Sequence, residues 1–245
     1  MRQTLSMIRT SLKESLSSRY IYLVLLVGIG ISLLLAASAY EYPGQISVPP
    51  AQYATSKSID IANFLGCVLA VFIASGSSGT KSLYEMELTK PIKRWWYLLS
   101  RVLSEVIFPL LIVAIILFST QAYILLRGGK FHIEIFIVIS LLSLAIMAVV
   151  GLIRVFSLFF GQMYSLGMGF VVVLFSDRAF RGALTKLDEP WGAFLYLFPD
   201  LQSPKLIASK VLYGIPVEWK YLLGPIIYIP VSLLIAVIIF QRKDL

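Results

Sequence analysis

The sequence predicts an all-α integral membrane protein with six transmembrane helices. Of its 245 residues, 58% are hydrophobic and only 14% are charged, whereas about a quarter of the residues of a soluble domain are charged. Several apolar runs approach the roughly 20 residues that a helix needs to cross a bilayer. The expected spans cover residues 20–39, 59–76, 104–126, 134–158, 161–178 and 221–240.

The segment before the first span is expected to be an amphipathic helix over residues 1–19. Its apolar residues are spaced by three or four positions, which puts them on one helical face; they are Leu5, Ile8, Leu12 and Leu16. Basic and hydroxyl side chains occupy the other face. This pattern is typical of a helix lying flat on the membrane surface, with its basic side chains toward the lipid headgroups.

The connections follow from proline, glycine and length. Residues 40–57 are polar and rich in proline, which indicates a loop. The apolar region 134–176 is too long for one span, so it predicts a helical hairpin. Its turn lies near Arg154 or near Gly161-Gln162, and we favour the second, because Gly and Gln interrupt the apolar run there. Residues 179–220 predict short re-entrant or interfacial helices, since no apolar run there is long enough to span.

The most informative connection is the charged loop 77–101. Residues 81–89 are rich in Leu, Met, Glu and Lys, which favour a short helix. Lys90 precedes Pro91, so this helix is expected to end there. A simple connection needs only four to six residues. The length, basic charge and apolar positions of this loop therefore predict a docking surface for a partner at the membrane face.

Composition and motifs argue against several other functions. The net charge of +8 suits anionic lipid headgroups and needs no nucleic acid. The sequence 76–82 lacks the glycine spacing of a nucleotide-binding phosphate loop. A single His cannot build a His-based metal cluster, and no nucleophile–base pair is visible, so we expect no catalytic, metal or cofactor-binding residues. His132 is interpreted as a surface residue and Cys67 as a packing residue.

Very few ionisable residues fall inside the spans. Glu105 and Arg154 are the intramembrane polar candidates, and both are expected to reach the membrane interface. An ion-driven carrier keeps a chain of such groups at mid-membrane. Any driving energy is therefore expected to come from outside this chain.

The order of these segments resembles the permease subunit of ABC-2 type ABC transporters. Gly79-Thr80, Leu88 and the run 90–94 (Lys-Pro-Ile-Lys-Arg) are similar to the family loop between spans two and three. The last six residues, 240–245, are similar to its "F..RDL" tail, and the run 198–200 (Phe-Pro-Asp) looks like part of its re-entrant outer region. Ser77-Ser78 departs from relatives that often have acidic and basic residues there.

The resemblance implies a division of labour. The segment 1–19 would be an elbow helix, and the loop 77–101 would carry a coupling helix that docks on a separate ATPase subunit. That partner would bind ATP and Mg²⁺, and two permease chains, identical or different, would form the substrate pathway between them. The implied docking residues are Gly79, Thr80, Leu83, Tyr84, Glu85, Met86, Glu87, Leu88, Pro91 and Arg94.

Six spans put both termini on one side of the membrane, and 12 of the 21 Lys and Arg residues are then on that side. The excess predicts cytoplasmic termini in the cell membrane. Two alternative functions remain open: a membrane-embedded enzyme acting on lipid or peptide, and a non-transporting scaffold subunit. The sequence does not identify a substrate.

Overall fold

The computed structural model describes residues 19–42, 48–76, 94–160, 162–176 and 198–242. These residues form seven α-helices and one 3-10 turn, and they contain no strand. The helices are α2 (Arg19–Glu41), α3 (Pro50–Gly76), α5 (Arg94–Leu126), α6 (Ile135–Phe160), α7 (Gln162–Phe175), α10 (Gln202–Leu212) and α11 (Leu223–Arg242), with the turn η3 at Trp219–Leu222. The predicted all-α fold class is confirmed for these ranges.

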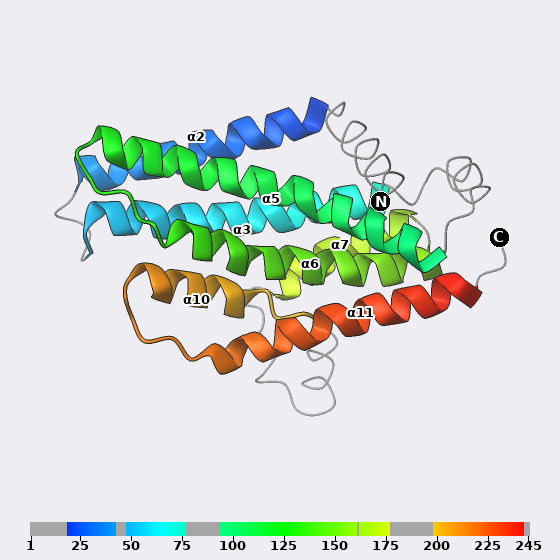
Figure 1. The fold of residues 1–245 in the computed structure, drawn as a ribbon. Coiled ribbons are helices and arrows are strands. Elements are labelled where there is room, and N and C mark those ends of the chain that lie inside the picture. Colours follow the sequence, from blue (N-terminus) through cyan, green and yellow to red (C-terminus); the bar gives the residue numbers. More distant parts are fainter. Residues whose placement is uncertain (1–18, 43–47, 77–93, 161, 177–197, 243–245) are drawn as a thin grey trace.

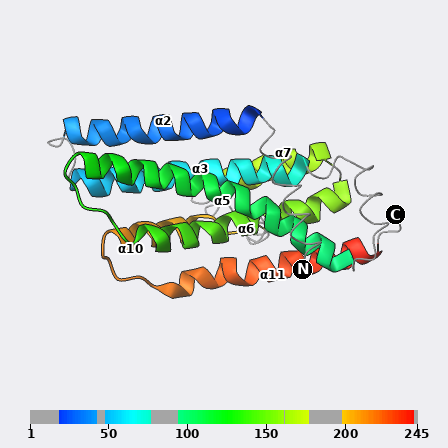
Figure 2. The same cartoon turned by 45° about the horizontal axis from the view of Figure 1, so that its top comes forward.

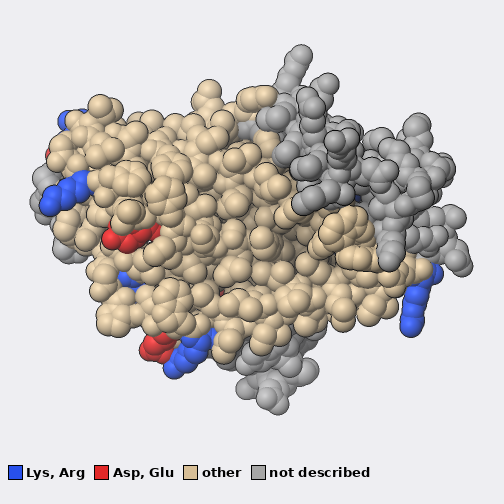
Figure 3. All heavy atoms as spheres, viewed as in Figure 1, with Lys and Arg blue, Asp and Glu red and all other residues tan. Residues whose placement is uncertain are grey.

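Five of the helices, α2, α3, α5, α6 and α11, are long and apolar enough to cross a membrane. The helix α7 is also apolar but has only 14 residues, so at about 1.5 Å per residue it is shorter than a bilayer's hydrocarbon core. Figure 3 shows a broad belt nearly free of charged side chains, with charged residues near the two ends of the bundle. The chain is therefore a multi-pass membrane protein by the character of its helices.

The five long helices lie side by side; α2, α3, α5 and α6 run in alternating directions, and α11 runs in the same direction as α6 (Figures 1 and 2). We call one end of the bundle the loop end; it is marked by Glu41, Leu126, Ile135 and Leu212. The opposite end, the termini end, is marked by Arg19, Gly76, Arg94, Phe160 and Arg242. The helix α7 starts at the termini end and stops inside the bundle, whereas α10 runs beside α6 to the loop end.

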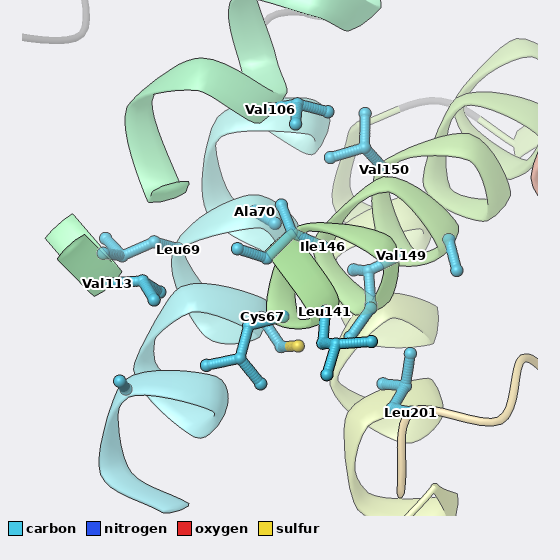
Figure 4. Close-up of a cluster of buried hydrophobic side chains, with 14 of the residues drawn as sticks. Cys67, Leu69, Ala70, Val106, Val113, Leu141, Ile146, Val149, Val150 and Leu201 are labelled. Carbon is cyan, nitrogen blue, oxygen red and sulfur yellow. The ribbon is translucent and has the colours of Figure 1, made fainter. Parts of the chain in front are cut away.

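The core of the bundle is built around α3 and α6. Small and branched side chains from α3, α5 and α6 interdigitate there, among them Cys67, Ala70, Val113 and Ile146 (Figure 4). Cys67 is buried in this cluster, which confirms its interpretation as a packing residue. Outer helices keep large apolar side chains exposed, such as Leu26 on α2 at 73%, as expected for a surface facing lipid tails.

The crossing of α6 and α11 depends on a glycine. A Cβ atom built on Gly151 would lie 2.5 Å from the Ser232 Oγ of α11, closer than real side-chain atoms approach. Small residues at such points let two helix backbones come close together, which increases dispersion contacts in a membrane. The absence of a side chain at Gly151 therefore sets the spacing between α6 and α11.

The turn after α5 has a recognisable geometry. Gly128 has φ +78°, and the Gly128 and Gly129 amides donate to the carbonyls of Leu125 and Ile124 at 3.0 and 2.9 Å. This is the Schellman ending of a helix, which favours Gly because an L side chain is strained at positive φ. On the other side of the bundle, α6 ends at Phe160 and α7 starts at Gln162, so the favoured position of the hairpin turn is confirmed.

Two helices extend beyond the expected spans. The helix α3 begins at Pro50, inside the expected loop 40–57, and α5 begins at Arg94, ten residues before the expected span 104–126. The reason is that hydropathy detects only the apolar part of a helix, while the helical backbone continues into polar residues. Proline is also favoured in the first turn of a helix, where its missing N–H has no helical partner. The expected loops 40–57 and 77–101 are accordingly shorter, and the described part of the expected span 161–178 is helical only over Gln162–Phe175.

Candidate functional site

The most unusual feature of the bundle is a carboxylate with no exposed surface. Glu105 on α5 is 0% exposed and Arg154 on α6 is 2% exposed. The Nε of Arg154 donates to Oε2 of Glu105 at 2.8 Å, and a terminal guanidinium nitrogen of Arg154 contacts Oε1. This two-point contact uses the planar fork of arginine, the geometry that makes an arginine–carboxylate pair strongest.

Arg101 brings a second cation to the same carboxylate. Its Nε lies 3.6 Å from Oε1 of Glu105, and its side chain is 14% exposed. Arg101 precedes Glu105 by one helical turn, so the two side chains share one face of α5. The three residues form a cluster with one negative and two positive charges, which we call the α5–α6 charge cluster.

The depth of the cluster follows from helix geometry. At about 1.5 Å per residue, Glu105 lies about 32 Å along α5 from Leu126, and Arg154 lies about 29 Å along α6 from Ile135. A hydrocarbon core is about 30 Å thick. The pair therefore lies near the termini-end boundary of the apolar region, in the part of α5 that follows directly from the charged loop.

The expectation that Glu105 and Arg154 reach the interface is wrong. Both residues lie at shallow depth, yet their side chains turn into the bundle and bind each other. An isolated charge in an apolar medium is costly, and a partner of opposite sign in direct contact offsets much of that cost. Sequence separation conceals the partnership, because the two residues are 49 positions apart.

The local backbone of α5 changes at the same place. Pro109 lies inside α5, and a proline has no N–H for the carbonyl four residues earlier, which here is the carbonyl of Glu105. Proline positions in long helices are the usual points of bending. The buried pair thus lies beside the point where the hydrogen-bond ladder of α5 is interrupted.

A second polar contact joins three parts of the chain near the loop end. The side-chain amide of Gln121 donates to Oγ1 of Thr55 at 3.0 Å, and its carbonyl oxygen accepts the backbone N–H of His132 at 3.1 Å. Gln121 and Thr55 are 1% and 0% exposed. The buried amide therefore ties α5 to α3 and to the α5–α6 turn. Sequence reasoning missed this contact, and a lone Gln in an apolar run was its only signal.

A third polar contact links α10 to α3. The Nζ of Lys205 lies 3.0 Å from Oδ1 of Asp60, and Lys57 lies 4.0 Å from the other carboxylate oxygen. The side chains of Lys205 and Asp60 are 28% and 37% exposed. The sequence places Asp60 at a span start but gives no indication of this partner.

Most of the predicted docking residues lie outside the described ranges. These residues are Gly79, Thr80, Leu83, Tyr84, Glu85, Met86, Glu87, Leu88 and Pro91, and the same holds for the elbow-face residues Leu5, Ile8, Leu12 and Leu16. Arg94 is the first residue of α5. The docking surface and the elbow helix therefore stay predictions.

The described residues include no group of three or more His, Cys, Asp and Glu side chains able to hold a metal ion. The ring Nδ1 of His132 lies 3.9 Å from a carboxylate oxygen of Glu134, and both side chains are partly exposed at the edge of the bundle. The polar contacts between helices found among the described residues are mainly ion pairs and amide hydrogen bonds. Such contacts fix helices to one another and can be broken and remade when helices move.

Searches with this sequence against protein-family models and against curated proteins found no match.

Proposed function

We propose that the chain is the transmembrane permease subunit of an ATP-driven exporter of the ABC-2 type. The carrying observation is the loop of residues 79–94, whose Gly-Thr, Leu and Lys-Pro-Ile-Lys-Arg elements are similar to the coupling loop of that family. The structure supports the proposal by the surroundings of this loop. The end of α3 and the start of α5, which flank this loop in the sequence, both lie at the termini end of the bundle (Figure 1).

In this proposal the loop acts as a lever for a separate ATPase. The partner binds ATP and Mg²⁺ and grips the helix 81–89, and ATP binding favours one arrangement of the spans over the other. A ligand shifts such an equilibrium only by its difference in affinity for the two states. A second permease chain completes the substrate pathway at the interface between the two copies.

The α5–α6 charge cluster would connect the proposed lever to α6. The helix α5 extends from Arg94, at the end of the loop, through Glu105 to Leu126. Glu105 is bound to Arg154 of α6. A displacement of the loop would therefore pull on α6 as well as on α5, because a buried ion pair resists separation.

The proposed topology has six crossings, of which the fifth in chain order is made of two pieces. The helices α7 and α10 have 14 and 11 residues, which together correspond to about 38 Å. The hydroxyl of Ser176, next to the end of α7, donates to the carbonyl of Pro199, just before α10, at 3.1 Å. Two half-length helices that meet inside the bundle together have the length of one crossing. Both termini then lie on one side, proposed to be the cytoplasm of the cell.

Copurification tests the docking surface. We expect the purified chain to retain the ATPase encoded beside it, and the triple variant Leu83→Asp, Met86→Asp, Leu88→Asp to lose it, because carboxylates would have to be desolvated against the partner. The matched control is Ile133→Asp, an exposed apolar residue in the α5–α6 turn at the opposite end. Retention of the ATPase by the triple variant contradicts the proposal, as does its loss in the control.

A further inference from the structure

The turn after α5 contains an arginine whose side chain is held by its own helix. The guanidinium carbon of Arg127 lies 5.4 Å from the centre of the Tyr123 ring, and the Nε of Arg127 donates to the Tyr123 hydroxyl at 3.1 Å. A cation over an aromatic ring is attracted to the negative face of that ring. Arginine has two further amino groups that can donate, and Arg127 is exposed, so these groups are held where an acceptor outside the protein can reach them.

A second tyrosine brings a hydroxyl to the same turn. Tyr40 of α2 meets Tyr123 edge to face, with the ring centres 6.1 Å apart, and both rings pack against a small buried cluster of the bundle. A Cβ atom built on Gly129 would lie only 3.1 Å from the Tyr40 hydroxyl oxygen. The absence of a side chain at Gly129 therefore lets this hydroxyl lie beside the backbone between Arg127 and Lys130.

The basic side chains at the loop end, several of which are visible in Figure 3, divide into two groups. Carboxylates contact three of them: Lys57, Lys205 and Lys220. The described residues show no ion pair for the other three: Arg127, Lys130 and Lys210. Of these, Arg127 and Lys130 are both exposed and lie three positions apart in one turn. This turn therefore concentrates two positive charges that the described part of the chain does not neutralise.

Exposed apolar side chains border the turn on both sides. Leu125 and Leu126 precede it, with Leu126 85% exposed, and the exposed Phe131 follows it. Tyrosine and arginine at the end of an apolar span are typical of the boundary between acyl chains and headgroups. The turn thus has apolar surface for acyl chains directly beside hydrogen-bond donors for a phosphate.

We propose that this turn binds one phospholipid with a net negative headgroup, at a site made of Arg127, Lys130 and the Tyr40 hydroxyl. The lipid phosphate accepts hydrogen bonds from these groups, and arginine suits phosphate because its planar fork offers two parallel donors. The acyl chains lie against Leu125 and Leu126. A zwitterionic lipid fits less well, because its ammonium group brings a further positive charge to a site that already has two. The site does not rest on the proposed exporter function, since it needs neither an ATPase nor a second permease chain.

A fluorophore beside the turn tests the site in a bilayer. Leu126→Cys in a Cys67→Ala background is labelled with bimane, and the protein is reconstituted into vesicles of phosphatidylglycerol and phosphatidylcholine in equal amounts. One of the two lipids has a quenching nitroxide on an acyl chain. We expect quenching to show phosphatidylglycerol enriched about three- to tenfold at this position, because two cations attract it. The same label on Ile215→Cys, another exposed position at the loop end, should show less than half of this enrichment.

Matched substitutions assign the enrichment to the proposed residues. Arg127→Gln and Lys130→Gln should each lower the enrichment at Leu126→Cys by about half or more, since each removes one of the two attracting charges. Tyr40→Phe keeps the ring and removes one donor, so it should cause a smaller loss. Lys210→Gln removes a cation at the same end that has no ion pair among the described residues and lies on α10, and it should leave the enrichment unchanged.

Three results would overturn the site. They are an enrichment at Leu126→Cys no greater than at Ile215→Cys, an enrichment that survives both Arg127→Gln and Lys130→Gln, and an equal loss in Lys210→Gln. Inorganic phosphate should lower the enrichment no more than chloride does at the same ionic strength, because the acyl chains hold the lipid in place. If phosphate displaces the lipid beyond this salt effect, the turn is a site for a soluble anion and the lipid assignment is wrong.

Discussion

Glu105 illustrates how a single carboxylate is accommodated in an apolar bundle. It is fully buried, bound at two points by Arg154, and approached by Arg101 from the preceding turn. Removing one member of such a pair leaves the other charge buried without compensation, which typically costs about 3–5 kcal/mol. Removing both members together costs much less, because neither charge then has to be desolvated.

This difference predicts a non-additive mutant cycle. Glu105→Gln and Arg154→Gln should each lower the unfolding free energy by about 3–5 kcal/mol. The double variant should lose less unfolding free energy than the sum of the losses in the two single variants. Chemical denaturation of the purified protein in detergent measures all three. Glu134→Gln is the matched control, since that carboxylate is 41% exposed, and it should change stability by less than about 0.5 kcal/mol.

Additive effects in this cycle would contradict the pairing of Glu105 with Arg154. A Glu105→Gln variant as stable as the parent would show that the carboxylate is not charged in the folded protein. The two results are distinguishable, because Glu105→Gln lowers stability in the first and leaves it unchanged in the second.

Gln121 is a second buried polar residue whose replacement should lower stability, by less than breaking the ion pair. Its amide satisfies Thr55 and the His132 backbone at once. The substitution Gln121→Leu keeps the bulk of the side chain but leaves the His132 N–H without this acceptor. An unsatisfied polar group of this sort costs about 1–3 kcal/mol. Denaturation should show that loss, whereas Gln202→Leu, at an only partly buried site on α10, should show less than half of it. Equal losses in the two variants would contradict a special role for Gln121.

At the scale of elements, the sequence predicted helices well and their partners poorly. Apolar runs identified the described spans because the bilayer requires a minimum apolar length, and the hairpin turn was predicted at Gly161 because a glycine and a glutamine interrupted the run. The early start of α3 at Pro50 was missed, since polar residues such as Lys57 continue the helix beyond the apolar run. The sequence shows Asp60 near the start of a span. Its contact with Lys205 depends on tertiary packing, which cannot be predicted from a single sequence.

The spacing of α6 and α11 gives a prediction at this scale. A methyl group at Gly151 would meet the Ser232 Oγ at 2.5 Å, while the next atom, the Ser232 Cβ, is at an ordinary 3.5 Å. Gly151→Ala should therefore lower the thermal midpoint, because the hydroxyl or the helix must shift. Adding Ser232→Ala should restore most of the loss, since the clashing oxygen is gone.

The control for this pair is Gly167→Ala on α7. A Cβ there would meet nothing within 4 Å, and alanine is the better helix former by about 1 kcal/mol. Its thermal midpoint should equal or exceed that of the parent. If Gly151→Ala is equally harmless, or if Ser232→Ala fails to compensate it, the close crossing of α6 and α11 is contradicted.

At the scale of the whole molecule, the number of crossings decides which surfaces face which compartment. Five long apolar helices alone would put the described ends of the chain on opposite sides. The bundle instead has Arg19 and Arg242 at the same end (Figures 1 and 2). The pieces α7 and α10 resolve this difference if together they supply one crossing, a solution that membrane proteins adopt where broken helix ends lie inside the protein.

The prediction concerns the two ends of this divided crossing. Met163, at the start of α7, is 87% exposed at the termini end, and Ile215, after α10, is 48% exposed at the loop end. In a Cys67→Ala background, Ile215→Cys should react with an impermeant maleimide added to intact cells, as should Ile133→Cys in the α5–α6 turn. Met163→Cys should react only after the membrane is permeabilised, because the termini end faces the cytoplasm in the proposed orientation. If Ile215→Cys and Met163→Cys react from the same side, α7 and α10 do not form a crossing. If all three positions react from the sides opposite to those stated, the crossing stands and the orientation, with the cytoplasmic docking loop, is wrong.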